Sequence, residues 1–587
     1  MKKNSARVAA GQGVPFCKSP MLSVKLPSGR SRFVMFLLFA AFAALIGRAL
    51  WLQGISTAFL QKKGELRYAH TLELPATRGR ITDRNGEVLA SSLPVKGIWA
   101  VPEDVLAAGR GQLKELAKLL DLSEDELYKK LDKERSLVYL KRQVEPALAD
   151  KIAALKIDGI EMRKEYKRYY PQGEVMAHVV GFTNAEDMGQ EGIELAQQKN
   201  LVGQPGSRRV IKDRLGRIVE DIATRNEPRD GKEVVLSIDS KLQYIASTQL
   251  KDAVAKFKAK AGAVVVLDVK TGEVLALANY PTFNPNERAG LSGAQLRNRV
   301  MTDTFEPGST MKPFPVALAM DTKRITPNTV IQTAPGRMTI SGRTIGDAHP
   351  HGAMTVSQII QKSSNVGTAK ITLQIPAQEF WDELTSAGFG QAPRFGFPGA
   401  VAGRLRPAKS WRPIEQATMS YGHGISVSLI QLARSYMIFA REGDIIPLSF
   451  LKVNELPKGQ SVISPKTAHD MRVMLESVVS PEGTAPKAQV PGYRVGGKTG
   501  TAYKPVRGGY DKSKYIGSFV GMAPMSDPRI IIAVMIDEPG GFFHYGGDVA
   551  APTFSAVAAN ALRSLNVAPD STITNIIIPT DGVQENM

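Results

Sequence analysis

Three short motifs in this chain carry residues that could together catalyse an acyl transfer. The first pairs Ser309 with Lys312, the second pairs Ser363 with Asn365, and the third is the Lys-Thr-Gly-Thr run that begins at Lys498. A serine hydroxyl is a poor nucleophile until a neighbouring group takes its proton, and a neutral lysine amine can do so. Each motif alone is weak evidence, but the three in this order indicate one catalytic site.

The nucleophile that this pattern predicts is Ser309. Pro307 and Gly308 precede it and an apolar run follows, which places the serine at a helix N-terminus, where free amide groups favour negative charge. Lys312 lies three residues further on and shares the face of Ser309, so we expect it to be the general base. Burial and the second cation, Lys498, would favour its neutral form. An isolated Ser-x-x-Lys would more simply be a helix cap beside a surface lysine.

The other two motifs supply groups that can relay protons and hold a substrate. Ser363 can pass a proton from Lys312 to a leaving amine, and Asn365 can hydrogen-bond a substrate amide or hold the lysine in place. The third motif is predicted to be an edge strand. Its glycine admits close approach of a ligand, and its lysine and threonines can bind a terminal carboxylate; these residues are Lys498, Thr499, Gly500 and Thr501. Taken alone, the third motif could equally follow a plain turn at the preceding glycine pair.

The histidines offer little alternative chemistry. His349 and His351 form the only close pair in the sequence and have no plausible cluster of further ligands. We therefore predict no metal site and no cofactor. A Ser-His-Asp mechanism is also disfavoured, because no histidine stands in an obvious catalytic context.

One apolar run is long enough to cross a membrane. Residues 33–52 are interrupted by a single charge, Arg48, and a helix of twenty residues spans a hydrocarbon core of about 30 Å. Residues 1–32 contain lysines and arginines but no acid, which places that side in the cytoplasm. A cleaved signal peptide is the competing interpretation. The length of the basic leader favours an uncleaved anchor with the rest of the chain outside the cytoplasm.

Composition narrows the class of protein further. A chain of 587 residues with 43% hydrophobic and 22% charged residues should fold into two or three globular domains. The net charge of +19 suits an anionic membrane or cell-wall surface, although a solvated basic face is the common explanation. No nucleic-acid-binding motif is visible. Cys17 is the only cysteine, so the fold has no intrachain disulfide.

The exported part divides into two regions of different pattern. Asn85-Gly86 predicts a hairpin, residues 113–131 and 145–155 show helical periodicity, and residues 53–72 could continue the anchor as a helical stalk. The second region has apolar strand candidates at both ends and helical stretches between them, which indicates an α+β domain with an antiparallel sheet flanked by helices. Its predicted strands are residues 233–238, 261–268, 274–278, 516–522 and 530–536, and its predicted helices are 241–255, 425–442 and 465–480.

These patterns give a five-part organisation. We expect a basic cytoplasmic tail, a single transmembrane helix, a stalk with an elongated mixed α/β pedestal, a catalytic domain and a loose C-terminal tail, at residues 1–32, 33–52, 53–228, 229–565 and 566–587. The pedestal contains no convincing cluster of nucleophile and base, so we expect it to be structural. No internal repeat is present.

Together with further motifs, this organisation resembles the class B penicillin-binding proteins, the monofunctional D,D-transpeptidases of bacterial cell walls. The resemblance includes the anchor, the three catalytic motifs and four further segments, at residues 78–90 (RGRITDRNGEVLA), 168–171 (RYYP), 189–194 (GQEGIE) and 420–424 (SYGHG). Among these proteins, the short loops and residues 420–436 look most like the division-specific members.

The resemblance implies a function in detail. Ser309 would be acylated by the D-Ala-D-Ala end of a peptidoglycan stem peptide, or by a β-lactam, with the oxyanion held by the backbone N–H groups of Ser309 and Thr501. An amino group on a neighbouring stem would then take the acyl group, with carboxypeptidase chemistry as a side reaction. It also implies a Gram-negative inner membrane, a periplasmic catalytic domain, and a polytopic glycan polymerase and other division proteins as partners.

Several alternatives remain open at this point. An elongation-specific transpeptidase would share the chemistry and differ in its partner. A β-lactamase would need a deacylating carboxylate and no pedestal or anchor. A bifunctional enzyme would need a glycosyltransferase domain, for which the pedestal shows no acidic pattern. A non-enzymatic β-lactam sensor is not excluded by the intact motifs, whereas a division scaffold would not require all three.

Overall fold

The structure is a computed structural model, which describes residues 28–55, 57, 59, 69–132, 137–212, 218–506 and 508–572. The chain forms two compact units. The first comprises Met1–Glu73 and Ser207–Asn226, and the second comprises Leu74–Gly206 and Glu227–Met587. We describe each unit by itself.

The first unit contains the predicted membrane span. Helix α1 (Ser28–Leu50) continues into a short π-helix, η2 (Trp51–Ile55), and an 18-residue window within Ser28–Gly54 has a mean hydropathy of 2.3 with none of its residues buried. The same unit holds a three-stranded sheet in the order β1-β6-β7, formed by β1 (Ala69–Leu74), β6 (Gly206–Lys212) and β7 (Ile218–Asn226).

The predicted helical stalk is wrong at its C-terminal end, which belongs to β1. Leu72 and Leu74 alternate with the more exposed Thr71 and Glu73, which is the period of a strand, and pairing with β6 satisfies the backbone. Residues 60–68 of the predicted stalk lie outside the described residues.

The pedestal is built on a second sheet, which belongs to the second unit. Its strands run in the order β4-β3-β2-β8, with β5 also paired to β3; they are β2 (Ile81–Thr82), β3 (Val88–Ala100), β4 (Val138–Val144), β5 (Ile160–Tyr169) and β8 (Val234–Val235). The predicted hairpin at Asn85-Gly86 is confirmed, since β2 and β3 pair antiparallel around it. Gly86 adopts φ +90°, and the Asp83 carboxylate accepts hydrogen bonds from the backbone of Asn85 and Glu87.

Two of the element predictions for these regions need correction. Residues 113–131 form two helices, α4 (Arg110–Leu120) and α5 (Glu124–Leu131), because Asp121 adopts a left-handed φ of 56° and Ser123 caps α5 in a box with Glu126. Residues 145–155 form one helix, α6 (Pro146–Ala154), as predicted. Residues 233–238 give only the short β8, which pairs with β2 of the pedestal and not with the catalytic sheet.

A buried ion network ties the pedestal motifs together. Glu194 is fully buried, and its two carboxylate oxygens accept hydrogen bonds from Arg78 Nε at 2.6 Å and Arg168 Nε at 2.7 Å. All three residues come from the segments that carry the family resemblance. Because one carboxylate bridges two guanidinium groups from distant parts of the chain, the network fixes the pedestal segments to one another.

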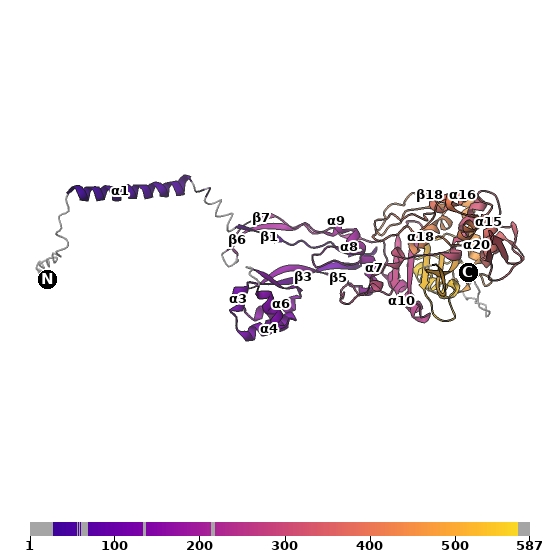
Figure 1. The fold of residues 1–587 in the computed structure, drawn as a ribbon, viewed down its shortest axis with the longest axis horizontal. Helices are drawn as coiled ribbons and strands as arrows, with labels where there is room; N and C mark the ends of the chain where they lie inside the picture. The colour runs from indigo at the N-terminus through magenta and orange to yellow at the C-terminus, as the bar shows by residue number, and fades with distance from the viewer. Residues whose placement is uncertain are drawn as a thin grey trace, which may run out of the picture. The chain divides into compact units, whose positions relative to one another are not determined.

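The catalytic domain is organised around a five-stranded antiparallel sheet, as predicted. The strands run in the order β10-β9-β21-β20-β19; they are β9 (Ala261–Asp268), β10 (Val274–Tyr280), β19 (Gly496–Val506), β20 (Gly509–Ala523) and β21 (Ile530–Asp537). β9 and β21 are buried along their whole length. The sheet packs against α10 (Ser240–Lys256), α18 (Leu429–Ser435), α20 (Pro465–Ser477) and α22 (Ala551–Ser564) (Figure 1).

Three predictions for this domain and the tail differ from the structure. The strand predicted over residues 516–522 begins earlier, since β20 starts at Gly509. The predicted helix over residues 425–442 starts later and is divided, since Ser428 caps α18 and a second short helix, α19 (Met437–Ala440), follows. The predicted loose tail begins with an attached segment. Asp570 accepts hydrogen bonds from the backbone of Arg494 and Ser526 at 2.7 and 3.1 Å, while residues 573–587 lie outside the described residues.

Candidate active site

Ser309 lies in a tight turn that immediately precedes a helix. The turn is a 3₁₀ helix, η4 (Gly308–Met311), and α13 (Pro313–Asp321) follows it, so the α-helix begins one turn later than predicted and Ser309 lies in the turn before it. The turn is held by Tyr436, whose hydroxyl donates to the Thr310 carbonyl oxygen at 2.7 Å. The Thr310 hydroxyl in turn donates to the carbonyl oxygen of Pro307 at 2.8 Å. Two hydrogen bonds therefore hold the turn that carries the nucleophile.

Lys312 joins the first two motifs. Its side chain is fully buried, and its Nζ donates hydrogen bonds to Ser309 Oγ and to Ser363 Oγ, both at 2.9 Å. The same amine also contacts the carbonyl oxygen of Ser363. An amine in this position can take the proton of Ser309 directly when it is neutral and can pass it to Ser363. The structure thus brings together the predicted nucleophile, base and relay.

The second motif sits at the junction of two helices. Ser363 ends α14 (Val356–Lys362) in a left-handed conformation with φ 60°, and Ser364 caps α15 (Asn365–Thr372). The side-chain amide of Asn365 donates to the Gly346 carbonyl oxygen at 3.0 Å. This sharp reversal turns the Ser363 hydroxyl toward Lys312.

Asp347 supports this junction and was not predicted from the sequence. Its carboxylate accepts hydrogen bonds from the Ser364 hydroxyl at 2.7 Å and from the Val366 backbone at 2.9 Å. The partners lie 17 and 19 residues away in the sequence, so no local motif marks the aspartate.

The third motif forms the edge strand that the sequence predicts, β19. Lys498 is fully buried and its Nζ donates to Thr499 Oγ1 at 3.2 Å. Thr499 Oγ1 is 3.0 Å from Thr484 Oγ1, and Thr501 Oγ1 accepts from the Gly546 backbone at 3.0 Å. These contacts hold the lysine and both threonines of the motif in fixed positions.

β19 lies directly against the turn that carries Ser309. A methyl group added at Gly500 would be 2.5 Å from the Pro307 carbonyl oxygen, and one added at Gly308 would be 2.8 Å from the Thr501 carbonyl oxygen. Only glycine allows two backbones to approach this closely. The backbone N–H groups of Ser309 and Thr501 therefore belong to two segments in direct contact, which is the arrangement that an oxyanion hole requires.

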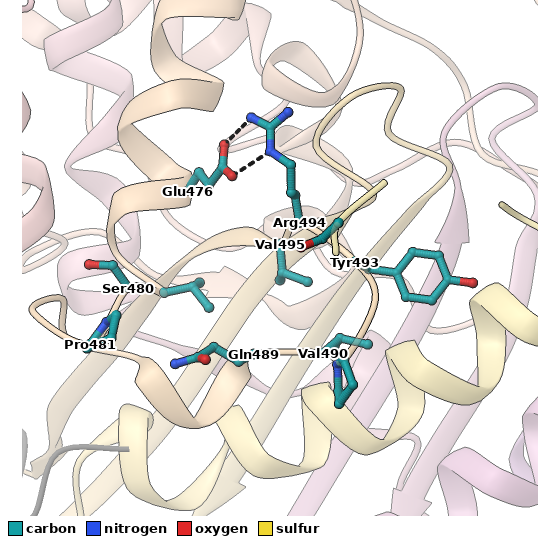
Figure 2. A pocket seen from close by; sticks show the side chains of 11 residues that line it. Glu476, Ser480, Pro481, Gln489, Val490, Tyr493, Arg494 and Val495 are labelled. Atoms are coloured by element: carbon teal, nitrogen blue, oxygen red, sulfur yellow. Dashed lines mark hydrogen bonds and ion pairs between the residues drawn. The ribbon is translucent and has the colours of Figure 1, made fainter. Parts of the chain in front are cut away.

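A separate pocket of about 230 Å³ lies beside the residues that lead into β19. Figure 2 shows Glu476 and Arg494 joined by two contacts at its rim, at 2.7 and 2.6 Å, with Gln489 and Val490 on the opposite wall. None of the 11 lining residues belongs to the three motifs, so this pocket is not the catalytic site. Among the described residues, no group of three or more His, Cys, Asp or Glu side chains could hold a metal ion.

The fold and these motifs define a penicillin-binding protein with a transpeptidase domain, and the chain belongs to this family. Residues 262–559 match the penicillin binding protein transpeptidase domain, and residues 73–236 match the penicillin-binding protein dimerisation domain. The matched regions correspond to the predicted catalytic domain and pedestal. The exact domain boundaries proposed from the sequence stay a prediction.

Curated relatives cover nearly the whole chain. The chain is 42% identical over 567 residues to a probable peptidoglycan D,D-transpeptidase, PenA, of Neisseria gonorrhoeae, covering 96% of this chain and 97% of the relative. It is 42% identical over 540 residues to the peptidoglycan D,D-transpeptidase FtsI of Escherichia coli, covering 91% of each chain.

Solved structures show the same likeness. The transpeptidase domain of penicillin-binding protein 3 from Burkholderia pseudomallei is 56% identical with a TM-score of 0.54, covering 57% of this chain and 98% of that one. Penicillin binding protein 3 from Mycobacterium tuberculosis, complexed with aztreonam, is 28% identical with a TM-score of 0.67, covering 86% of this chain and 100% of that one.

Proposed function

We propose that this protein is a serine D,D-transpeptidase that cross-links peptidoglycan stem peptides through an acyl-enzyme on Ser309. The observation that carries the proposal is the position of the buried Lys312 amine, 2.9 Å from the hydroxyls of both Ser309 and Ser363. The names of the curated relatives support the same reaction class.

Acylation follows from this geometry. Lys312 takes the proton of Ser309, whose Oγ attacks the carbonyl carbon between the two D-alanines of the donor stem. The N–H groups of Ser309 and Thr501 stabilise the oxyanion. The bond to the terminal D-alanine then breaks, and its amine leaves with a proton delivered through Ser363.

Deacylation runs the same steps in reverse with a different nucleophile. The amino group of a neighbouring stem loses its proton to the Lys312–Ser363 pair, attacks the ester and forms the cross-link. Water in place of the amine gives the carboxypeptidase side reaction. A β-lactam acylates Ser309 in the same way, but its leaving amine stays attached to the acyl group.

The third motif is proposed to hold the donor. Lys498 supplies the positive charge that attracts the terminal carboxylate, and the hydroxyls of Thr499 and Thr501 can donate hydrogen bonds to it. Asn365 is proposed to orient the substrate amide. These substrate-binding roles are proposed from the positions of the residues in the site.

The cellular setting is proposed from the anchor and the relatives. One N-terminal apolar helix fits a single-pass anchor, and we propose a bacterial inner membrane with a cytoplasmic N-terminus and the catalytic domain in the periplasm, at the division septum. A polytopic glycan polymerase is the expected partner.

An elongation-specific transpeptidase is the second candidate. Imaging whether a fluorescent penicillin labels the septum or the side wall of intact cells distinguishes it from a division-specific transpeptidase. A non-enzymatic division scaffold would tolerate loss of Ser309, whereas a β-lactam sensor would need Ser309 for its acylation but would not cross-link stem peptides.

The decisive experiment is adduct mapping. After treatment of the full-length protein with penicillin, mass spectrometry should find a single adduct, on the peptide that contains Ser309, and none in Ser309→Ala. Cells that depend on Ser309→Ala should fail to divide. An adduct that persists in this variant, or normal division with it, would contradict the proposal.

A further inference from the structure

Glu306 is a carboxylate near the nucleophile that the reaction above does not use. It lies three residues before Ser309, directly after the short strand β11 (Thr304–Phe305), and its side chain is 11% exposed. Its Oε1 accepts hydrogen bonds from the Gly424 backbone N–H at 2.8 Å and from the Tyr510 hydroxyl at 3.0 Å. Its Oε2 is 3.2 Å from Nδ1 of His423.

These partners come from two other segments of the catalytic domain. His423 and Gly424 lie in the loop between α17 (Pro413–Met419) and β16 (Val427–Ser428). Tyr510 lies at the beginning of β20, where it pairs with β19 in the hairpin that continues the Lys-Thr-Gly strand. A single carboxylate therefore joins the nucleophile turn, the α17–β16 loop and the hairpin.

The same three segments also meet through their backbones beside Ser309. A methyl group added at Gly422 would be 2.2 Å from the Gly308 carbonyl oxygen, and one added at Gly308 would be 2.8 Å from the Thr501 carbonyl oxygen. The loop, the turn and the strand are thus stacked in that order. The two N–H groups proposed for the oxyanion hole belong to the turn and to the strand.

We propose that Glu306 is a positioning residue for acyl transfer: by holding the loop and the hairpin onto the nucleophile turn, it sets the spacing of the Ser309 and Thr501 N–H groups. This inference rests on the proposed function. An oxyanion hole works through preorganised donors, and displacing one by a fraction of an ångström weakens it. Glu306 touches no reacting atom in this scheme and acts through the backbone.

The Tyr510 hydroxyl can donate its hydrogen bond to Glu306 over a wide pH range. Burial, together with the negative charge of Glu306 and the hydrogen bond to it, raises the pKa of Tyr510 to about 12. The phenol therefore stays protonated and continues to donate to the carboxylate at neutral and moderately alkaline pH.

The test compares three variants of the full-length protein in detergent. Glu306→Gln keeps the side-chain volume but leaves only one carbonyl oxygen to accept the hydrogen bonds of Gly424, Tyr510 and His423. Tyr510→Phe removes the tyrosine hydroxyl that donates one of these hydrogen bonds. Glu379→Gln is the control for losing a carboxylate as such, since Glu379, on α16 (Ala377–Ser386), pairs with Arg324 at 3.0 Å and belongs to none of the three segments that Glu306 joins. Stopped-flow acylation by a fluorescent penicillin gives the acylation rate constant and the initial binding constant separately.

We expect Glu306→Gln to lower the acylation rate constant about 10- to 100-fold and Tyr510→Phe to lower it less, with the initial binding constant changed less than about threefold. Glu379→Gln should behave like the parent protein. An unchanged acylation rate constant in both Glu306→Gln and Tyr510→Phe would overturn the inference.

An infrared difference spectrum separates positioning of the oxyanion hole from a merely structural contribution. With a penicillin labelled by ¹³C at its lactam carbonyl, the ester band of the acyl-enzyme should move to higher wavenumber in Glu306→Gln, because the carbonyl oxygen receives weaker hydrogen bonds. A slower reaction with an unshifted band would overturn the inference. Should Glu306→Gln fail to fold, the band of Tyr510→Phe decides by the same criterion. Failure of the parent protein to acylate at Ser309 would instead contradict the proposed function.

Discussion

The pedestal and the catalytic domain each bury an ionisable side chain completely, but they surround it differently. Glu194 in the pedestal accepts hydrogen bonds from two guanidinium groups, whereas Lys312 in the active site donates to two serine hydroxyls. A buried charge is costly unless its partners compensate it. The pedestal therefore uses burial to fix three segments of the chain together. The active site uses it to hold an amine beside groups whose protons must move.

The largest expected effect is at Lys312. Lys312→Met removes the base and the buried amine while keeping the volume, so acylation by β-lactams should fall by about 10³-fold or more. The thermal unfolding temperature should stay unchanged or rise, because an apolar side chain replaces a buried polar group. Acylation kinetics measure the expected loss of activity, and calorimetry measures the unfolding temperature. A variant that loses stability along with activity would break the comparison.

Glu194 should show the opposite pattern. Glu194→Gln leaves Arg78 and Arg168 buried without a compensating charge, so the free energy of unfolding should fall by about 3–5 kcal/mol. Acylation per folded molecule should be unaffected. The matched control is Glu186→Gln, because the Arg142–Glu186 pair is exposed and should contribute less than about 1 kcal/mol. Chemical denaturation measures both, and equal losses for the two variants would contradict the contrast.

His178 gives the pedestal a pH dependence. Burial lowers the pKa of His178 to about 4, and its Nε2 is 2.8 Å from the Gln295 carbonyl oxygen. The unfolded state therefore binds a proton below about pH 6.5 while the folded state stays neutral until about pH 4. Stability should be full above pH 6.5 and fall as pH drops, by up to roughly 3 kcal/mol at pH 4.

Denaturant melts between pH 7 and pH 4 measure this loss. His178→Phe should flatten the profile over that window, since it keeps an aromatic ring and removes the titrating group. A profile with the same slope in the variant would assign the pH dependence to other groups.

The smallest effect is expected at Lys498. Lys498→Ala removes the charge for the donor carboxylate, which is equivalent to about 1.5–3 kcal/mol, or roughly 10- to 100-fold in acylation efficiency. Acyl donors without the carboxylate should be affected much less. Acylation efficiencies for a matched pair of donors, with and without the carboxylate, test this. Equal losses for both would show that Lys498 acts on the chemistry instead.

From the sequence, only those residues of the site that lie in short motifs could be predicted. Ser309 and Lys312 lie within one turn, so their proximity follows from helical geometry. The contact of Lys312 with Ser363 could be expected only from the co-occurrence of motifs. Asp347 and Glu306 were missed because their partners are 17 or more residues away and no spacing rule marks them.

The fold was predictable to a similar degree. The antiparallel sheet and its edge strand followed from apolar strands at both ends of the domain. The break at Asp121 was not seen, because helical periodicity continues across it and only the capping box at Ser123 marks the new start. Residues 233–238 looked like a strand of the catalytic sheet, yet which sheet a strand joins depends on tertiary contacts that a local pattern does not carry.

The three-stranded sheet of the first unit sets an order of assembly. β1 ends at Leu74 and pairs with β6, while β7 ends at Asn226, so about 150 residues must be synthesised before the sheet can close. At about 5–20 residues per second, this takes roughly eight to thirty seconds after β1 is made. Over that interval β1, the strand that follows the membrane anchor in the sequence, has no partner strand in its own sheet. Closure of the sheet therefore follows synthesis of the whole pedestal segment that lies between β1 and β6 in the sequence.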